Sequence, residues 1–78
     1  MRLGDDDLAR LRAALAGRPP GEFHLPEIWG EDWGRLWIGE RVQAGHAFLD
    51  AVRAGRLAGV EDTGRKAGGG RVYAWRGG

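Results

Sequence analysis

The chain has 78 residues, enough for one small domain and too few for a two-lobed enzyme with a cleft between its lobes. It contains no cysteine, which excludes disulfides, cysteine-type zinc fingers and thiol catalysis, and we expect a cytoplasmic protein. The formal net charge of +1 hides an asymmetry, because residues 1–50 carry six arginines against nine acidic residues and residues 51–78 carry six basic residues against two acidic ones. No apolar run approaches the roughly 18 residues of a membrane span, so we expect no membrane partner.

The first predicted element is an amphipathic helix over residues 6–16. Leu8, Leu11 and Leu15 recur at helical spacing, and an acidic run at residues 5–7 lies at the positive end of the helix. The glycine and two prolines that follow end it. The three aspartates lack the alternating ligand spacing of a calcium loop. We therefore interpret them as helix-capping residues and expect no metal there.

A short strand and a second helix come next. Residues 22–25 alternate polar and apolar, which predicts the strand, and Pro26 suits the first position of a helix over residues 26–37. Gly30 and Gly34 weaken this helix. We expect its second turn to be irregular or broken.

Three tryptophans, Trp29, Trp33 and Trp37, are spaced by four in this region. Such a row can form a ligand box or a nucleobase platform. Because the chain has few large apolar residues, we expect at least two of the three to lie in the core, and Trp33 to be largely buried.

The strongest helical pattern predicts a main helix over residues 40–54. Its expected inward stripe, about 80° wide at 100° per residue, is formed by Ile38, Val42, Gly45, Leu49 and Val52, with Phe48 beside it. Its expected outward face is formed by Glu40, Gln43, Ala44, Ala47, Asp50, Ala51 and Ala54.

The C-terminal part, residues 57–76, predicts a two-stranded hairpin with arms at 59–63 and 71–76 and a mobile basic tip at 64–70. The order helix, strand, helix, helix, hairpin is that of a winged helix. We therefore expect an α+β, winged-helix-like fold in which three helices, a short strand and a C-terminal β-hairpin wing form one domain over residues 1–78.

Motifs spread over residues 22–76 support this fold. They are Phe23-x-Leu25, Gly30-Glu31-Asp32-Trp33, Gly39-Glu40-Arg41, Gly45-x-x-Phe48-x-x-x-Val52, Val60 and Tyr73. This pattern resembles a family of small bacterial proteins, the domain of unknown function 1413 family. Its motifs look like core, turn and cap positions, so the resemblance implies a fold and no catalytic residue.

Catalytic and metal-binding patterns are weak. Nucleophilic catalysis has Thr63 as its candidate, with no histidine near it in sequence. His46 and Asp50 are four residues apart and offer two metal ligands where three or four are needed. The glycine-rich tract at 64–70 lacks the ending of a phosphate-binding loop and precedes a strand. We expect a protein without enzymatic activity, metal or cofactor.

Two hypotheses for function remain. In the first, the protein is a bacterial or phage regulator that binds double-stranded DNA, with the main helix in the major groove and the wing on phosphates. Glu40 and Asp50 on the same outward face would oppose phosphate binding. The candidate nucleic-acid-binding residues are Arg41, Gln43, Arg53, Arg65, Lys66 and Arg71.

In the second hypothesis the domain is a protein-interaction or dimerisation adaptor. Four alanines on the main helix form a smooth stripe on which a helix of a protein partner, or of a second copy in a homodimer, can pack closely. Alanine's helix propensity alone also explains such a stripe. The candidate interface residues are Ala44, Ala47, Ala51 and Ala54.

Overall fold

The computed structural model describes residues 3–77, so residues 1, 2 and 78 of the expected domain lie outside the described residues. Its elements are α1 (Asp5–Ala16), β1 (Gly21–Phe23), α2 (Leu25–Trp29), the 3₁₀ helix η1 (Glu31–Arg35), α3 (Ile38–Arg53), β2 (Val60–Ala67) and β3 (Gly70–Trp75). The strands form one antiparallel sheet in the order β1-β3-β2. The predicted α+β class and element order are confirmed.

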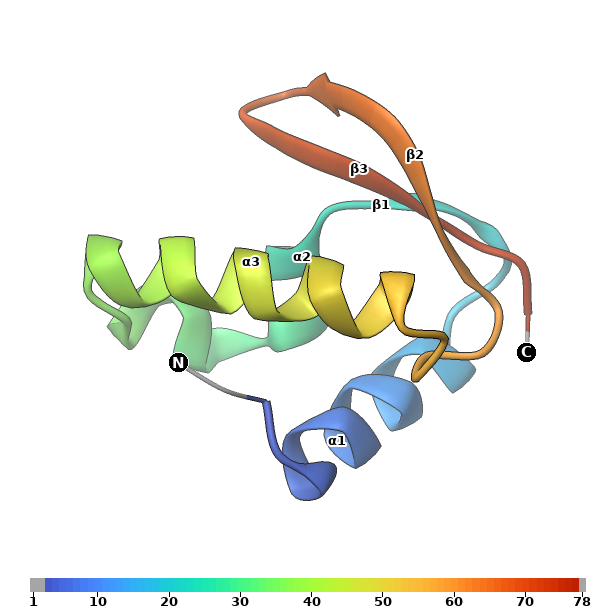
Figure 1. The fold of residues 1–78 in the computed structure, drawn as a ribbon, viewed down its shortest axis with the longest axis horizontal. Helices are drawn as coiled ribbons and strands as arrows, with labels where there is room; N and C mark the ends of the chain where they lie inside the picture. Colours follow the sequence, from blue (N-terminus) through green and yellow to red (C-terminus); the bar gives the residue numbers. More distant parts are fainter. Residues whose placement is uncertain (1–2, 78) are drawn as a thin grey trace.

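The sheet and the helices form two layers, and the β2–β3 hairpin arches over α3 (Figure 1). The three strands form the first layer, α1 lies on the other side of α3 from the hairpin, and α2 lies behind α3 in this view. Helix α1 begins where its predicted cap places it, since Asp7 Oδ2 accepts a hydrogen bond from the Gly4 backbone N–H at 3.1 Å. Its three leucines are buried, as their spacing predicted.

The second predicted helix is shorter than expected. Residues 26–37 do not form one helix, because α2 ends at Trp29 and Gly30 adopts a φ of 93°, which favours glycine. The one-turn helix η1 follows, and α3 begins at Ile38, two residues before the predicted start. The predicted strand ends at Phe23 because Leu25 already begins α2.

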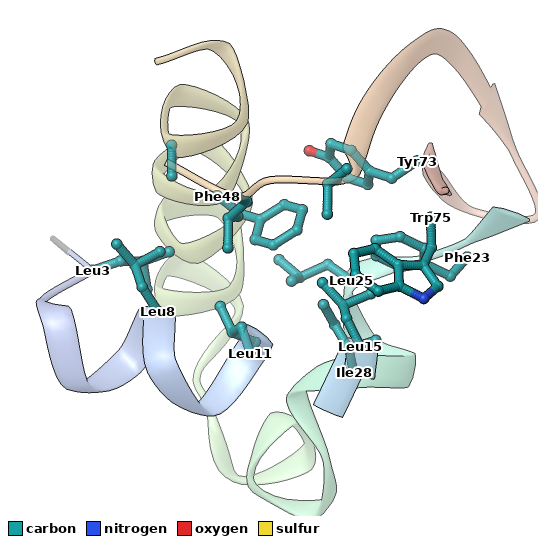
Figure 2. Packing of buried hydrophobic residues seen from close by; sticks show 13 residues of the cluster. Leu3, Leu8, Leu11, Leu15, Phe23, Leu25, Ile28, Phe48, Tyr73 and Trp75 are labelled. Carbon is teal, nitrogen blue, oxygen red and sulfur yellow. The ribbon is translucent and has the colours of Figure 1, made fainter. Parts of the chain in front are cut away.

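An aromatic cluster forms the centre of the core (Figure 2). The ring of Phe48 on α3 meets Tyr73 edge-on at a centroid distance of 4.7 Å and Phe23 edge-on at 6.4 Å. Phe23 and Tyr73 stack at 5.8 Å, on directly paired positions of β1 and β3. Burial raises the pKa of Tyr73 to about 12. Phe48 has no exposed surface, so this cluster fixes how α3 sits on the sheet.

The predicted inward face of α3 is correct only in part, since Leu49 and Val52 are partly buried against the core but the stripe as a whole does not face inward. The buried residues of the helix are Ala44, Phe48 and Ala51, whereas Ile38 and Val42 are 77% and 53% exposed. At 100° per residue the helix is rotated by roughly 100° from the orientation that its apolar stripe predicts. The physical reason is that Phe48 is the largest side chain on α3, and seating its ring between two aromatic rings of the sheet outweighs burial of smaller side chains.

The tryptophan expectations hold only in part. Trp29 and Trp33 meet edge-on at 5.5 Å and pack against the core from its edge, each half-buried. Trp33 is therefore less buried than expected, because it lies on the short η1 turn with one side open to solvent. Trp37 is 79% exposed. Trp75 is the tryptophan inside the core, where its Nε1 donates to the Arg18 carbonyl oxygen at 3.1 Å.

The hairpin is longer and its turn tighter than predicted. Strand β2 continues to Ala67, so the expected mobile tip at residues 64–70 is largely strand. The turn consists of Gly68 and Gly69, whose φ angles of 60° and 91° are both positive, as a type I′ turn requires. The other two glycines of the tract belong to the strands: Gly64 lies in a register irregularity between Asp62 and Lys66, and Gly70 begins β3.

Candidate functional site

A groove lies between the outer side of α3 and the β2–β3 hairpin. Two adjoining cavities of about 300 and 680 Å³ make it up, and Arg41, His46, Lys66 and Arg71 line both. Its floor is apolar and is formed by Leu25, Pro26, Trp33, Leu49 and Tyr73. Among the described residues, no aspartate or glutamate lines either cavity. The groove is therefore a cationic surface with an apolar floor.

Arg41 projects from the first turns of α3 and is half-buried. Its Nε donates to the Trp33 carbonyl oxygen at 3.2 Å and its Nη2 to the Gly34 carbonyl oxygen at 3.3 Å. These bonds hold the guanidinium in place without neutralising it, since residues 3–77 supply no carboxylate within ion-pair distance. Arg41 therefore carries a fixed, uncompensated charge at the edge of the groove.

Lys66 lies opposite, on β2, and is exposed. It pairs directly with Arg71 of β3, so two cations face each other across the hairpin on the groove side. Like charges at opposed positions destabilise a sheet. Lys66 makes no ion pair within the described part of the chain.

Arg71 differs from Lys66 because a carboxylate balances it. Its Nη1 donates to both Asp62 carboxylate oxygens, at 2.9 and 3.1 Å, and an Arg53 nitrogen lies 4.0 Å from the same carboxylate. The Gly64 backbone N–H donates to Asp62 Oδ1 at 3.0 Å. This backbone bond, then Arg71, holds the pKa of Asp62 below its ordinary value. Arg53 and Arg71 thus share one negative charge at the base of the hairpin.

Three of the predicted nucleic-acid-binding residues do not line the groove. One of them is Arg53, which lies beside Asp62. Arg65 is exposed and forms an ion pair with Glu22 of β1, across the sheet. Gln43 lines a separate groove of about 440 Å³ on the other side of α3, where Asp50 also lies. The structure therefore brings Arg41, Lys66 and Arg71 together in the groove lining and leaves Gln43, Arg53 and Arg65 out of it.

The two acidic residues expected to oppose phosphate also lie apart from the cationic groove. Glu40 Oε1 accepts a hydrogen bond from the Trp37 backbone N–H at 2.9 Å, so its carboxylate caps the start of α3. Asp50 belongs to the separate groove. The outward-facing acid predicted beside the basic residues is consequently absent from the lining of the cationic groove.

The alanine stripe is not an exposed face. Ala44 and Ala51 are 0% and 5% exposed and lie in the chain's own interior, while Ala47 is half-buried and packs against the core. Ala54 alone of the four is exposed. The expectation that all four form a surface for a second helix is wrong, because α3 turns its small residues inward with Phe48.

Sequence reasoning missed the role of His24. Its Nε2 donates to the Ala67 carbonyl oxygen at 2.6 Å, and its Nδ1 lies 3.4 Å from Glu27 Oε2. The same Glu27 carboxylate accepts the His24 backbone N–H at 2.6 Å, which is the main cause that lowers the pKa of Glu27. His24 therefore connects the start of α2 to the end of β2 and fixes the height of the hairpin above the groove. Since His24 and Ala67 are 43 residues apart in the sequence, no local pattern could reveal this contact.

Other site chemistry is limited. In residues 3–77 no group of three or more histidines and acidic residues lies close enough together to hold a metal ion. None of the helices described there is both long and apolar enough to cross a membrane.

Comparison with known proteins gives one match. A family model with the description "Domain of unknown function (DUF1413)" matches residues 13–74. No curated protein and no solved structure matches the chain significantly.

Proposed function

Because the chain belongs to the DUF1413 family, as its motifs predicted, and the family description names no activity, we propose a function from the groove itself: the domain is a winged helix that binds double-stranded DNA. The observation that carries this proposal is the groove between α3 and the hairpin, which Arg41, Lys66 and Arg71 line and no described carboxylate enters.

The topology supports the proposal. The element order α1, β1, α2, α3, β2, β3 and the strand order β1-β3-β2 are those of a winged helix, in which the third helix is the recognition helix and the hairpin is the wing. Recognition helices of the helix-turn-helix type lie in the major groove and contact base edges with their N-terminal residues. Here the hairpin arches over α3, so a duplex that receives α3 also meets the wing (Figure 1).

The charge distribution supports it as well. Most of the described arginines are ion-paired within the chain, namely Arg10, Arg18, Arg35, Arg53, Arg56, Arg65, Arg71 and Arg76. Within residues 3–77 the cations without an ion pair are Arg12, Arg41 and Lys66, and the last two line the groove. A duplex phosphate beside Arg41 or Lys66 would provide the missing negative charge, and each cation that neutralises a phosphate releases condensed counterions.

A salt-dependent titration of the protein with a duplex tests the proposal. Replacing both Arg41 and Lys66 by glutamine should weaken binding to any sequence and reduce the slope of log affinity against log salt by roughly two, at about one per phosphate contact. The matched control is Arg10→Gln with Arg35→Gln, which removes two charges that are ion-paired outside the groove. The control should keep the wild-type slope.

Two outcomes would count against the proposal. Wild-type protein that binds no duplex more tightly than about 10⁻⁴ M at low salt falls below ordinary non-specific affinity. Equal loss of slope in the groove variant and the control would mean that net charge, not the groove, governs binding. Because Arg41 also bonds to the carbonyls of η1, Lys66→Gln alone should be measured too, with an expected slope change of about one.

The protein-interaction alternative no longer has its alanine stripe, but it has another observation in its favour. Trp37, Ile38 and Val42 are large apolar residues exposed at the start of α3. Light scattering on the same samples separates the alternatives: an adaptor that self-associates gives a homodimer and no duplex binding, whereas the DNA-binding proposal needs the duplex complex.

A further inference from the structure

We propose that the start of α3 reads the C5-methyl groups of thymine in the major groove, through Ile38 and Val42. This inference rests on the proposed duplex binding and specifies which bases it prefers. The observation behind it is that the first two turns of the helix present two exposed apolar side chains, of which Val42 lines the cationic groove.

The exposure of these side chains is unusual for the chain. Ile38 is 77% and Val42 53% exposed, although the chain has a thin core that needs its large apolar residues. They are four residues apart on a helix, so they lie on one face, one turn from each other. The orientation of α3 that buries Phe48 leaves Ile38 and Val42 exposed to solvent. A partner that covers them would remove this apolar surface from water.

The residues between Ile38 and Val42 do not cover the face that these two side chains form. Gly39 has no side chain, the Glu40 carboxylate is bound to the Trp37 backbone, and Arg41 turns toward η1 and the groove. The face that Ile38 and Val42 form, in the part of the helix that enters the major groove first in a helix-turn-helix complex, therefore offers methyl groups.

That chemistry matches one base edge better than the others. In the major groove, guanine, cytosine and adenine present hydrogen-bonding groups, whereas thymine adds a methyl group. An isoleucine or valine pressed against unpaired donors or acceptors leaves them unsatisfied, while contact with a thymine methyl buries apolar surface on both sides. Arg41, one residue before Val42, and Lys66 across the groove provide the positive charge that a duplex requires beside this face.

A pair of synthetic duplexes tests the inference without knowledge of the natural site. One has alternating adenine and thymine, and the other has deoxyuridine in place of every thymine, which removes only the methyl groups. We expect wild-type protein to bind the thymine duplex more tightly, by roughly fourfold for each methyl group contacted, with the same salt slope for both. The double variant Ile38→Ala with Val42→Ala should bind the two duplexes equally, and the salt slope should stay unchanged.

Trp37→Ala is the matched control, because Trp37 is as exposed as Ile38 but precedes the helix. It should keep the preference for thymine. Loss of the preference in this control as well would overturn the assignment to the helix face.

The remaining outcomes separate the inference from the function on which it rests. Equal wild-type affinity for both duplexes, with a normal salt slope, overturns the thymine inference and leaves duplex binding intact. Binding to neither duplex removes the proposed function and the inference together. If the wild-type protein is a dimer and the double variant Ile38→Ala with Val42→Ala is a monomer, the apolar face packs on a second copy. That result would also overturn the inference.

Discussion

Replacing Phe48 by alanine should destabilise the protein more than any change on the outer side of α3. The side chain is fully buried, and its ring meets Tyr73 at 4.7 Å and Phe23 at 6.4 Å. Removing a buried phenylalanine costs about 3–5 kcal/mol, of which each lost aromatic pair accounts for about 0.5–1.5 kcal/mol. A domain of this length has about 4–12 kcal/mol of stability in total, so Phe48→Ala should leave it marginally folded.

Phe48→Leu is the measurable form of the same perturbation. It keeps most of the volume and loses the ring contacts, so we expect a cost of about 1–3 kcal/mol in urea unfolding followed by tryptophan fluorescence. Val42→Ala, on the exposed face, should change the unfolding free energy by less than about 0.5 kcal/mol. If Val42→Ala costs as much as Phe48→Leu, then α3 presents its apolar stripe to the core and the rotation described here is wrong.

Three further changes give separate tests. Gly68→Asn should be neutral or stabilise the protein by up to about 1 kcal/mol, because Asn-Gly suits a type I′ turn and the added Cβ makes only ordinary contact with His24, at 3.6 Å; a thermal melt that falls by several degrees would contradict this. Gly69→Val, at a φ of 91°, should cost about 1–2 kcal/mol in the same assay. Asp62→Asn should destabilise the protein at neutral pH. Since the pKa of Asp62 is lowered by folding, the stability that its carboxylate contributes is present above about pH 4 and is lost as the pH falls through the lowered value, so the difference between wild type and Asp62→Asn should shrink there.

The sequence predicts the elements of the fold well, because they depend on local signals. The leucine spacing of α1 and its acidic start were sufficient to place the helix within one residue. Gly30 signalled the break in the second helix, although not that a separate 3₁₀ turn would follow. The two glycines of the hairpin turn have positive φ, but the long glycine-rich tract around them hid which residues form the turn and which continue the strand.

The orientation of α3 was beyond local reasoning. Its apolar stripe contains more large side chains than the face that is buried, so periodicity favours the wrong side. The decisive contacts of Phe48 are to residues of β1 and β3 about 25 positions away in either direction, and a single aromatic ring in a hydrophobicity pattern counts no more than a leucine. The error also affected the candidate sites. Ala44 and Ala51, expected at the surface, are buried, and Ile38 and Val42, expected in the core, are exposed.

The sequence identifies the candidate nucleic-acid-binding residues by their basic side chains, but it does not show which of them form ion pairs within the chain. Nothing local to Arg65 indicates that it pairs with Glu22, which is 43 residues away. The same holds for the bond between His24 and Ala67 that positions the hairpin. A count of basic residues therefore indicates a basic C-terminal half, and only the tertiary structure separates neutralised arginines from Arg41 and Lys66.

The most direct test of the cationic groove as a DNA-binding site is to map a duplex onto the protein by NMR. Backbone amide shifts of the ¹⁵N-labelled protein are followed as a duplex is added at low salt. We expect the largest changes on Gly45 of α3 and on Gly69 and Gly70 of the hairpin, which line the groove and give well-separated glycine signals. Changes centred instead on Ala47 and Ala54 in the separate groove, or no changes at equimolar duplex, would contradict it.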